Sequence, residues 1–210
     1  QIKLRKELGK EFKNNNILFP KIIAHDKNFI IEEWVEGKTF EKINISKRKT
    51  YSLELIKFLK KLQFDKKFID LAKNNNKSFC YLSDYLLKRL KPWAQWLPVE
   101  NLINEWLISD EQTKNIIEKK ISHPDLSLSN LIESSKNKKI YIVDNELIGV
   151  GKGWLLDERN SYFRNKLKNQ KLEPLISRFY DLSWKMRLVG SAIDNGQFMR
   201  AKRMANIELN

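Results

Sequence analysis

The stretch that decides the fold reads Ser122-His123-Pro124-Asp125-Leu126-Ser127-Leu128-Ser129-Asn130, and the apolar run Ile140-Tyr141-Ile142-Val143 follows it and ends at Asp144. The apolar run predicts a short strand, and the polar stretch before it predicts a loop. The pattern is therefore His-x-Asp-x-x-x-x-Asn on a loop, followed by an aspartate at the end of a strand. A loop and a strand in this order can direct all three polar side chains at one point.

Phosphoryl transfer needs these residue types. A carboxylate, here Asp125, has to orient or accept the proton of the attacking hydroxyl. An amide oxygen and a second carboxylate, here Asn130 and Asp144, can hold Mg²⁺ on the nucleotide phosphates. By composition, the loop pattern would arise by chance in about one chain in a hundred. The alternative is a capped loop in which Asp125 and Asn130 bond only to the backbone.

Towards the N-terminus, the pattern predicts a helix followed by a hairpin. Apolar residues recur every four positions in residues 3–13, with charged residues between them, which is typical of a helix. Residues 21–25 and 29–35 are largely apolar, and a short polar turn separates them. We therefore expect two paired strands there.

The rest of the chain has the periodicity of helices, with few strands. Strands are thereby segregated from helices, which favours an α+β fold over an alternating parallel sheet. We expect helices over 50–72, 79–97 (interrupted at Pro92), 100–120 and 173–207, a loop over 121–132 and a strand over 139–143.

The composition fits a globular protein and excludes several other classes. The chain has 210 residues, 41% of them hydrophobic, which is enough for a core without disulfide bonds. Its single cysteine, Cys80, excludes an intrachain disulfide and a cysteine-built zinc site, and it fits a reducing compartment such as the cytoplasm. No apolar run approaches the about 20 residues of a membrane-spanning helix, so we expect no membrane span.

The charge of the chain is strongly positive. Lys and Arg number 40 against 26 Asp and Glu, which gives a formal net charge of +14. Such a charge is typical of proteins whose partners bear phosphate: nucleotides, nucleic acid or anionic membranes. The lysines are nevertheless spread along the whole chain and accompany runs of Asn, so a general compositional bias explains many of them.

The loop and the strand resemble the catalytic region of the aminoglycoside phosphotransferase and choline kinase family, the small-molecule relatives of the protein kinases. That family has His-Gly-Asp-x-x-x-x-Asn followed by Ile-Asp-x-Glu. This chain has His123-Pro124-Asp125 and Asn130, followed by Val143-Asp144-Asn145-Glu146. Protein kinases have Asp-Phe-Gly at the second motif. The resemblance implies a protein-kinase-like α+β fold with two lobes.

The resemblance also implies roles for the polar residues. On the N-terminal side, Glu7 matches the helix glutamate that pairs with a nucleotide-binding lysine, with Glu11 as runner-up. The backbone of Glu33, Trp34 and Val35 matches the hinge that faces the adenine. The C-terminal motif implies Asp125 as the catalytic base, His123 and Asp157 (Asp181 being a weaker candidate than Asp157) as supports of the catalytic loop, and Asn130 and Asp144 as metal ligands.

Three departures from the family pattern limit what the resemblance implies. Pro124 stands where the family has glycine, which fixes φ and removes an N–H. The glycine-rich segment 149–153 matches no phosphate-binding motif and predicts a turn. The glycine-rich strand pair and its lysine, which precede the first helix in the family, are absent from this sequence, and Lys3 lies too close to Glu7 to replace that lysine.

From the third departure we expect a truncated N-terminal lobe. Residues 1–37 would be its remnant, and residues 38–210 would form a mostly helical C-terminal lobe. The chain begins with Gln1, so either upstream sequence is missing or the protein is a shortened relative. Without the glycine-rich loop and its lysine, the positioning of the phosphates would be severely impaired.

Three tryptophans precede the catalytic loop. Trp93, Trp96 and Trp106 lie where the family shapes its acceptor pocket, but they fit plain core packing as well. The function that the sequence predicts is an ATP- and Mg²⁺-dependent phosphotransferase acting on a small-molecule hydroxyl, as in a sugar, an amino alcohol or an aminoglycoside-like compound. A catalytically silent kinase-like binding module is the alternative. A basic nucleic-acid-binding protein is a third and weaker reading.

Overall fold

A computed structural model describes residues 2–73, 81–117, 120–123, 126–152 and 173–206. The chain divides into two compact units. The first unit comprises Gln1–Ser78 and Lys120–Leu156, and the second comprises Phe79–Lys119 and Asp157–Asn210. The boundary between two kinase lobes that the sequence predicted, residues 1–37 and 38–210, stays a prediction.

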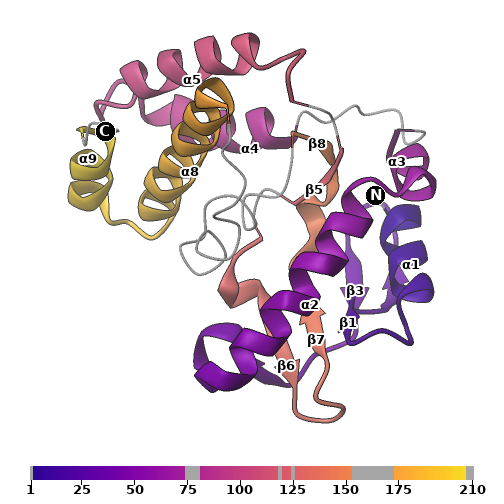
Figure 1. Ribbon diagram of the computed structural model, residues 1–210. Helices are drawn as coiled ribbons and strands as arrows, with labels where there is room; N and C mark the ends of the chain where they lie inside the picture. The colour runs from indigo at the N-terminus through magenta and orange to yellow at the C-terminus, as the bar shows by residue number, and fades with distance from the viewer. Residues whose placement is uncertain (1, 74–80, 118–119, 124–125, 153–172, 207–210) are drawn as a thin grey trace. The chain divides into compact units, whose positions relative to one another are not determined.

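The first unit is built on a four-stranded sheet in the order β1-β7-β6-β4 (Figure 1). The N-terminal strands lie at the two edges, and the β6–β7 hairpin of the loop motif lies between them. β1 runs parallel to β7, and β6 is antiparallel to both of its neighbours. The bounds are β1 Ile17–Leu18, β4 Gly37–Thr39, β6 Leu131–Ser134 and β7 Ile140–Ile142.

The sequence predicted only one strand of this sheet, β7. The strands β1, β4 and β6 have two to four residues each and show no alternation of apolar and polar residues. Pairing with distant segments defines them, and no local pattern reports such pairing.

Two smaller sheets complete the strands of the first unit. β2 (Ile22–His25) pairs antiparallel with β3 (Ile30–Glu32), which confirms the predicted hairpin. β5 (Lys120–Ser122) pairs antiparallel with β8 (Gly149–Gly151). The prediction of a turn at the glycines was therefore wrong. Gly151 lies against Ser122, whose hydroxyl a Cβ atom would meet, so the glycine permits a close approach of the two strands.

Three helices pack around these strands. The leucines of α1 are buried, as its four-residue repeat predicted. Phe12, just after α1, contacts Phe58 of α2 and Phe68 of α3 with ring centroids 4.8 and 5.6 Å apart. The predicted helix over 50–72 is two helices, because the Asp65 side chain accepts the Lys67 N–H (3.0 Å) and begins a new one. The bounds are α1 Ile2–Glu11, α2 Ile45–Gln63 and α3 Lys66–Lys73.

The described part of the second unit is helical. α8 packs against α4, α5 and α9. The core of this unit contains Trp106 of α5, whose indole N–H donates to the Ser183 hydroxyl of α8 (2.8 Å). The predicted helix over 173–207 is two helices separated at Gly196, which has a positive φ of 68° that glycine adopts at low cost. The bounds are α4 Tyr81–Leu90, α5 Glu100–Gln112, α8 Pro174–Asp194 and α9 Phe198–Asn206.

The observed elements confirm the predicted α+β class. Described strands belong to the first unit, and the described part of the second unit consists of helices and turns. Among the described residues, none of the helices combines the length and the apolar character needed to cross a bilayer.

Candidate active site

The β6–β7 hairpin brings Asn130 and Asp144 together. Leu131 pairs with Ile142 in this hairpin, and the next residues outward, Asn130 and Val143, are joined by a backbone hydrogen bond of 2.9 Å from the Val143 N–H. The Asn130 side-chain Nδ2 donates to Asp144 Oδ2 at 3.3 Å. The spacing between the two residues is therefore the length of one hairpin.

The turn after β7 holds Asp144 in an unusual conformation. Asp144 has φ 62° and ψ 51°, a left-handed conformation that costs a non-glycine residue about 1 kcal/mol or more. The buried side chain of Asn145 supports this turn, because its Nδ2 donates to the Ile142 carbonyl (2.6 Å). Backbone strain of this kind is concentrated at functional sites, and here it turns the exposed Asp144 carboxylate towards Asn130.

Asp144 lines a cavity of about 870 Å³ within the first unit. The start of α1 and the turn between β2 and β3 line it too, and Lys3, Arg5 and Glu32 are among its charged residues. The Arg5 guanidinium is buried and forms an ion pair with Glu32. This pair has no net charge, and it fixes the position of a guanidinium group in the wall of the same cavity as Asp144.

The chemistry of the donors fits Mg²⁺. The Asn130 amide oxygen and the Asp144 carboxylate are hard oxygen ligands, and Mg²⁺ commonly takes one or two such groups and completes its shell with water and phosphate oxygens. Within the part of the chain that the structure describes, no three His, Cys, Asp or Glu residues form a metal-binding cluster. Two oxygen ligands of this kind suit a hydrated Mg²⁺.

The other residues of the predicted catalytic loop are placed only in part. Asp125 and Asp157 lie outside the described residues, as does Pro124. His123 follows β5 directly and is fully buried, and its carbonyl accepts the Leu126 N–H at 3.0 Å. The roles assigned to all of these residues stay predictions.

Glu7 is not among the residues that line the cavity of Asp144. Its carboxylate lies 3.2 Å from Lys10 Nζ and 3.9 Å from Lys67 Nζ. The runner-up, Glu11, forms an ion pair of 2.8 Å with Lys67. The hydrogen bond from Lys67 lowers the pKa of Glu11, and the same bond raises the pKa of Lys67. Both glutamates therefore have partners on α1 or α3.

The predicted hinge lines a second cavity of the first unit. Glu33, Trp34 and Val35 are among the residues around a space of about 450 Å³. The Glu33 N–H donates to the Lys21 carbonyl (2.9 Å), which extends the β2–β3 pairing, and the Trp34 side chain is 90% exposed. The structure does not bring these residues to the cavity of Asp144, and their role in nucleotide binding stays a prediction.

Sequence reasoning missed three residues of the site. Arg5 and Glu32 are 27 positions apart and meet only because α1 packs beside β3, so no local pattern could pair them. Asn145 carried a usable signal, since an Asn directly after a strand often bonds back to the backbone of a turn.

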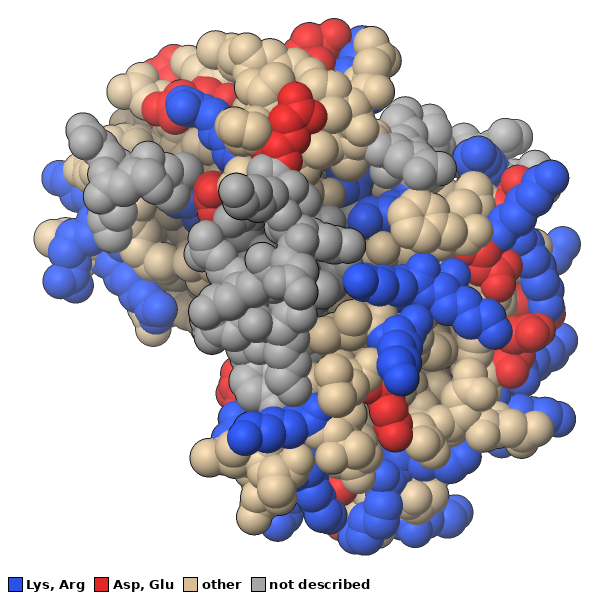
Figure 2. Space-filling view, in the orientation of Figure 1, with Lys and Arg blue, Asp and Glu red and all other residues tan. Residues whose placement is uncertain are grey.

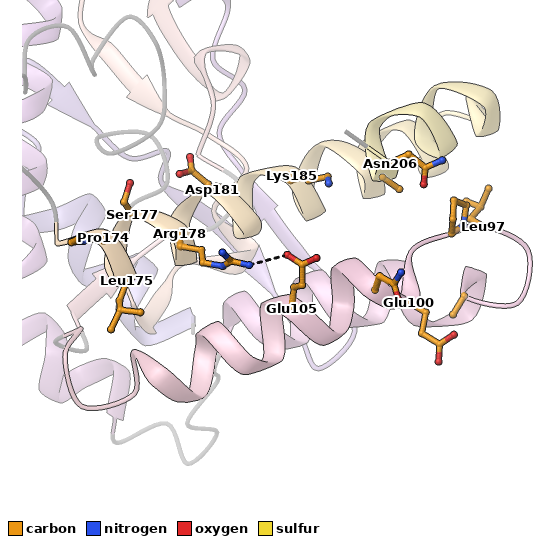
Figure 3. Close-up of a pocket in the computed structure, with 14 residues that line it drawn as sticks. Leu97, Glu100, Glu105, Pro174, Leu175, Ser177, Arg178, Asp181, Lys185 and Asn206 are labelled. Atoms are coloured by element: carbon orange, nitrogen blue, oxygen red, sulfur yellow. Dashed lines mark hydrogen bonds and ion pairs between the residues drawn. The ribbon is translucent and has the colours of Figure 1, made fainter. Parts of the chain in front are cut away.

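The second unit has a cavity of its own, of about 1,020 Å³, between α5, α8 and α9 (Figure 3). Glu105 and Arg178 face each other there as an ion pair of 3.2 Å, and Asp181 and Lys185 lie further along α8. No aromatic side chain is among the described residues that line it. Of Trp93, Trp96 and Trp106, Trp106 belongs to the core, which agrees with the alternative prediction of core packing.

No protein-family model and no curated protein sequence matches this chain. Among solved structures, the chain is similar to LicA in complex with AMP, with a TM-score of 0.57 and 16% identity over 97% of this chain and 77% of that one. It is also similar to the choline kinase LicA from Streptococcus pneumoniae, with a TM-score of 0.54 and 16% identity over 98% of this chain and 80% of that one. The chain therefore has the fold of these choline kinase structures, which confirms the predicted fold.

Proposed function

We propose that this protein is an ATP- and Mg²⁺-dependent phosphotransferase that acts on a hydroxyl of a small molecule. The observation that carries the proposal is the contact of Asn130 with Asp144 at the end of the β6–β7 hairpin. The fold supports it, since the similar structures are choline kinases and one of them was solved with AMP.

The polar residues of the candidate site have distinct tasks in this proposal. The Asn130 amide oxygen and the Asp144 carboxylate would hold Mg²⁺, which when bound neutralises charge on the transferred phosphoryl group. Lys3, Arg5 and Lys27 face three acidic residues around the cavity, so their side chains would donate hydrogen bonds to phosphate oxygens while Mg²⁺ would supply the net positive charge. Asp125 is the proposed base, on the strength of the sequence motif alone.

The proposed acceptor is a polar compound such as a sugar or an amino alcohol. One of the similar structures is a choline kinase, and choline is itself an amino alcohol. The resemblance of the loop motif to the aminoglycoside phosphotransferases supports a sugar as the other kind of acceptor.

A silent binding module is the second candidate, and one observation favours it. Glu7, which should pair with a nucleotide-binding lysine, is instead bound to Lys10 and Lys67 on the helices α1 and α3. A module of this kind would bind no Mg²⁺-ATP in calorimetry, whereas the kinase would.

The test of the proposed function is ATP turnover with a panel of sugars and amino alcohols. We expect Asp144→Asn to lower turnover about 100-fold or more, because it removes a ligand charge that the transition state needs. Glu41→Gln is the matched control, since Glu41 is an exposed acid of the same unit outside the cavity.

Two results would contradict the proposal. One is equal turnover by the parent protein and the Asp144→Asn variant. The other is the absence of both turnover with the whole panel and binding of Mg²⁺-ATP in calorimetry.

A further inference from the structure

The second unit carries an exposed aromatic and basic surface that no part of the proposed reaction uses. It is formed by the outer face of α9 and by the turn that follows α4. We name it the α9 face and define it by its exposed or half-exposed side chains: Lys91, Trp93, Trp96, Phe198, Met199, Arg200, Lys202 and Arg203.

Large apolar side chains of this face point into solvent. Trp96 is 73% exposed, Met199 71% and Phe198 41%. Trp93 packs on Phe198 with the ring centroids 5.0 Å apart, and this contact joins the turn to the start of α9. Exposed apolar groups clustered in this way mark an interaction site more often than isolated ones do.

The geometry of α9 presents its cations outward. Ala201 and Ala205 are buried on the side that packs against α8. Met199, Arg200 and Arg203 then share the opposite side, because residues three and four apart lie on the same face of a helix. An apolar group thus stands beside two guanidinium groups on one short surface.

The charge of the face exceeds what the general composition gives. The eight residues of the α9 face include four Lys and Arg and no Asp or Glu, although the whole chain has 26 acidic residues for 40 basic ones. None of these four cations forms an ion pair within the described ranges, and the neighbouring Asp194 is paired with Arg89. In Figure 2, Lys and Arg side chains gather over α9 at the left edge of the view.

We propose that the α9 face docks on an anionic lipid surface. Trp and other amphipathic side chains favour the interface between headgroups and hydrocarbon, and Lys and Arg are attracted to anionic headgroups. The α9 face offers both in one place, which is the combination that peripheral binding requires. The +14 charge of the chain complements such a surface at longer range.

Single-stranded nucleic acid fits the same face less well. Its binding relies on aromatic rings with open faces on which bases stack. Here Trp93 and Phe198 lie against each other, which leaves Trp96 as the one largely exposed ring of the face, and Met199, on the outermost side of α9, has no ring at all. A flexible thioether between guanidinium groups suits insertion among lipid chains.

Sedimentation of the full chain with vesicles tests the proposal. We compare vesicles of phosphatidylcholine alone with vesicles in which about a third of the lipid is phosphatidylserine. The triple variant R200Q/K202Q/R203Q should bind the anionic vesicles roughly 100-fold more weakly, because each cation near such a surface contributes a factor of several. Trp96→Ser should weaken binding independently of charge, and its exposed position spares the fold.

Matched controls separate the face from the general charge. K38Q/K42Q/K57Q removes three exposed lysines of the first unit, and Ile108→Ser removes a 60% exposed apolar group of the same unit as α9. Both should bind anionic vesicles as the parent does. The proposal is overturned by failure to bind anionic vesicles, by equal loss in the control triple, or by a single-stranded RNA that binds more tightly and depends on the same three cations.

Discussion

At the scale of single residues, Gly37 shows how closely the strands of the first unit approach. A Cβ atom at this position would overlap the carbonyl oxygen of Glu133 on the neighbouring strand β6. The φ of Gly37 is not positive, so the requirement is one of space. We expect Gly37→Ala to lower the free energy of unfolding by about 1–3 kcal/mol, as overpacking does, measured by urea denaturation.

Gly9 provides the matched control for this substitution. It lies within α1, and its added Cβ would meet only ordinary contacts, the nearest being the Pro20 carbonyl oxygen at 3.7 Å. Gly9→Ala should therefore leave stability unchanged or raise it by up to about 1 kcal/mol, because alanine favours the helix. Equal effects of the two substitutions would contradict the pairing of β4 with β6.

Residues of the site differ in how far the sequence could predict them. The contact of Asn130 with Asp144 follows from a motif whose spacing equals one hairpin, so local sequence contains it. The ion pair of Arg5 with Glu32 depends on how α1 packs beside β3, which is tertiary and has no local signature. Asp125, on which the proposed chemistry depends most, lies outside the described residues.

At the scale of elements, the carboxylate of Glu133 on β6 joins the β6–β7 hairpin to α2. Glu133 accepts hydrogen bonds from the Tyr51 hydroxyl (2.8 Å) and from Lys47 Nζ (3.3 Å). Burial opposes the ionisation of Glu133, but these bonds and the charges of Lys47 and Lys138 outweigh it and lower its pKa. Burial, followed by the bond to Glu133, raises the pKa of Tyr51 to about 12.

These two pKa shifts define the pH range over which the hydrogen bonds of Glu133 stabilise the fold. A carboxylate whose pKa is lowered by folding contributes stability above its unfolded pKa, and this is lost as the pH falls through the folded value. A phenol whose pKa is raised contributes below about pH 10, and this is lost as the pH rises towards about 12. We expect Glu133→Gln to cost about 1–2 kcal/mol near pH 7, and much less in acid, when urea unfolding is followed against pH.

Tyr51→Phe serves as the companion variant. It keeps the ring and removes the hydroxyl, so it should lose the alkaline part of the pH dependence. It should also diminish the acid part, because the hydrogen bond from Tyr51 is the foremost of the interactions that lower the pKa of Glu133. If Glu133→Gln lowered the free energy of unfolding equally at acid and neutral pH, its effect would come from packing. The ionised carboxylate would then not be the group that stabilises the contact between α2 and the hairpin.

The helix α1 and the β2–β3 hairpin lie close to where the pattern put them. The helix predicted over 100–120 ends at Gln112, so α5 is eight residues shorter than expected. The errors fall where an element is defined by its neighbour. β8 was predicted as a turn because its glycines match no phosphate-binding motif, yet Gly151 permits the close approach to β5. Helix breaks at Asp65 and Gly196 are single-residue events that periodicity does not report.

At the scale of the whole molecule, the basic residues behind the net charge of +14 lie in at least two places with different proposed ligands. Lys3 and Arg5 lie in the cavity of Asp144, where phosphates are proposed to bind. The cations of α9 lie on the second unit, where an anionic surface is proposed. A single bulk measurement, such as the salt dependence of binding to phosphate-rich polymers, would average over the two.

Hydrogen exchange with and without Mg²⁺-ATP distinguishes the two basic regions in the intact chain. We expect slower exchange at residues 2–5, at 26–32 and at Asp144, which together contain the residues that line the cavity. At a nucleotide concentration 100 times Kd, amides that exchange through opening of this region should slow about 100-fold. The segment of α9, residues 198–206, should be unaffected and acts as an internal control.

The same experiment decides the role of the predicted hinge. The Glu33 N–H is already bonded to the Lys21 carbonyl, whereas residues 34–36 line the separate cavity of about 450 Å³. Protection that extends from the Asp144 cavity to residues 34–36 would confirm the hinge as an adenine site. Protection of residues 34–36 with none around Asp144 would contradict the proposed phosphate site, because the phosphates and the metal they carry would then bind elsewhere.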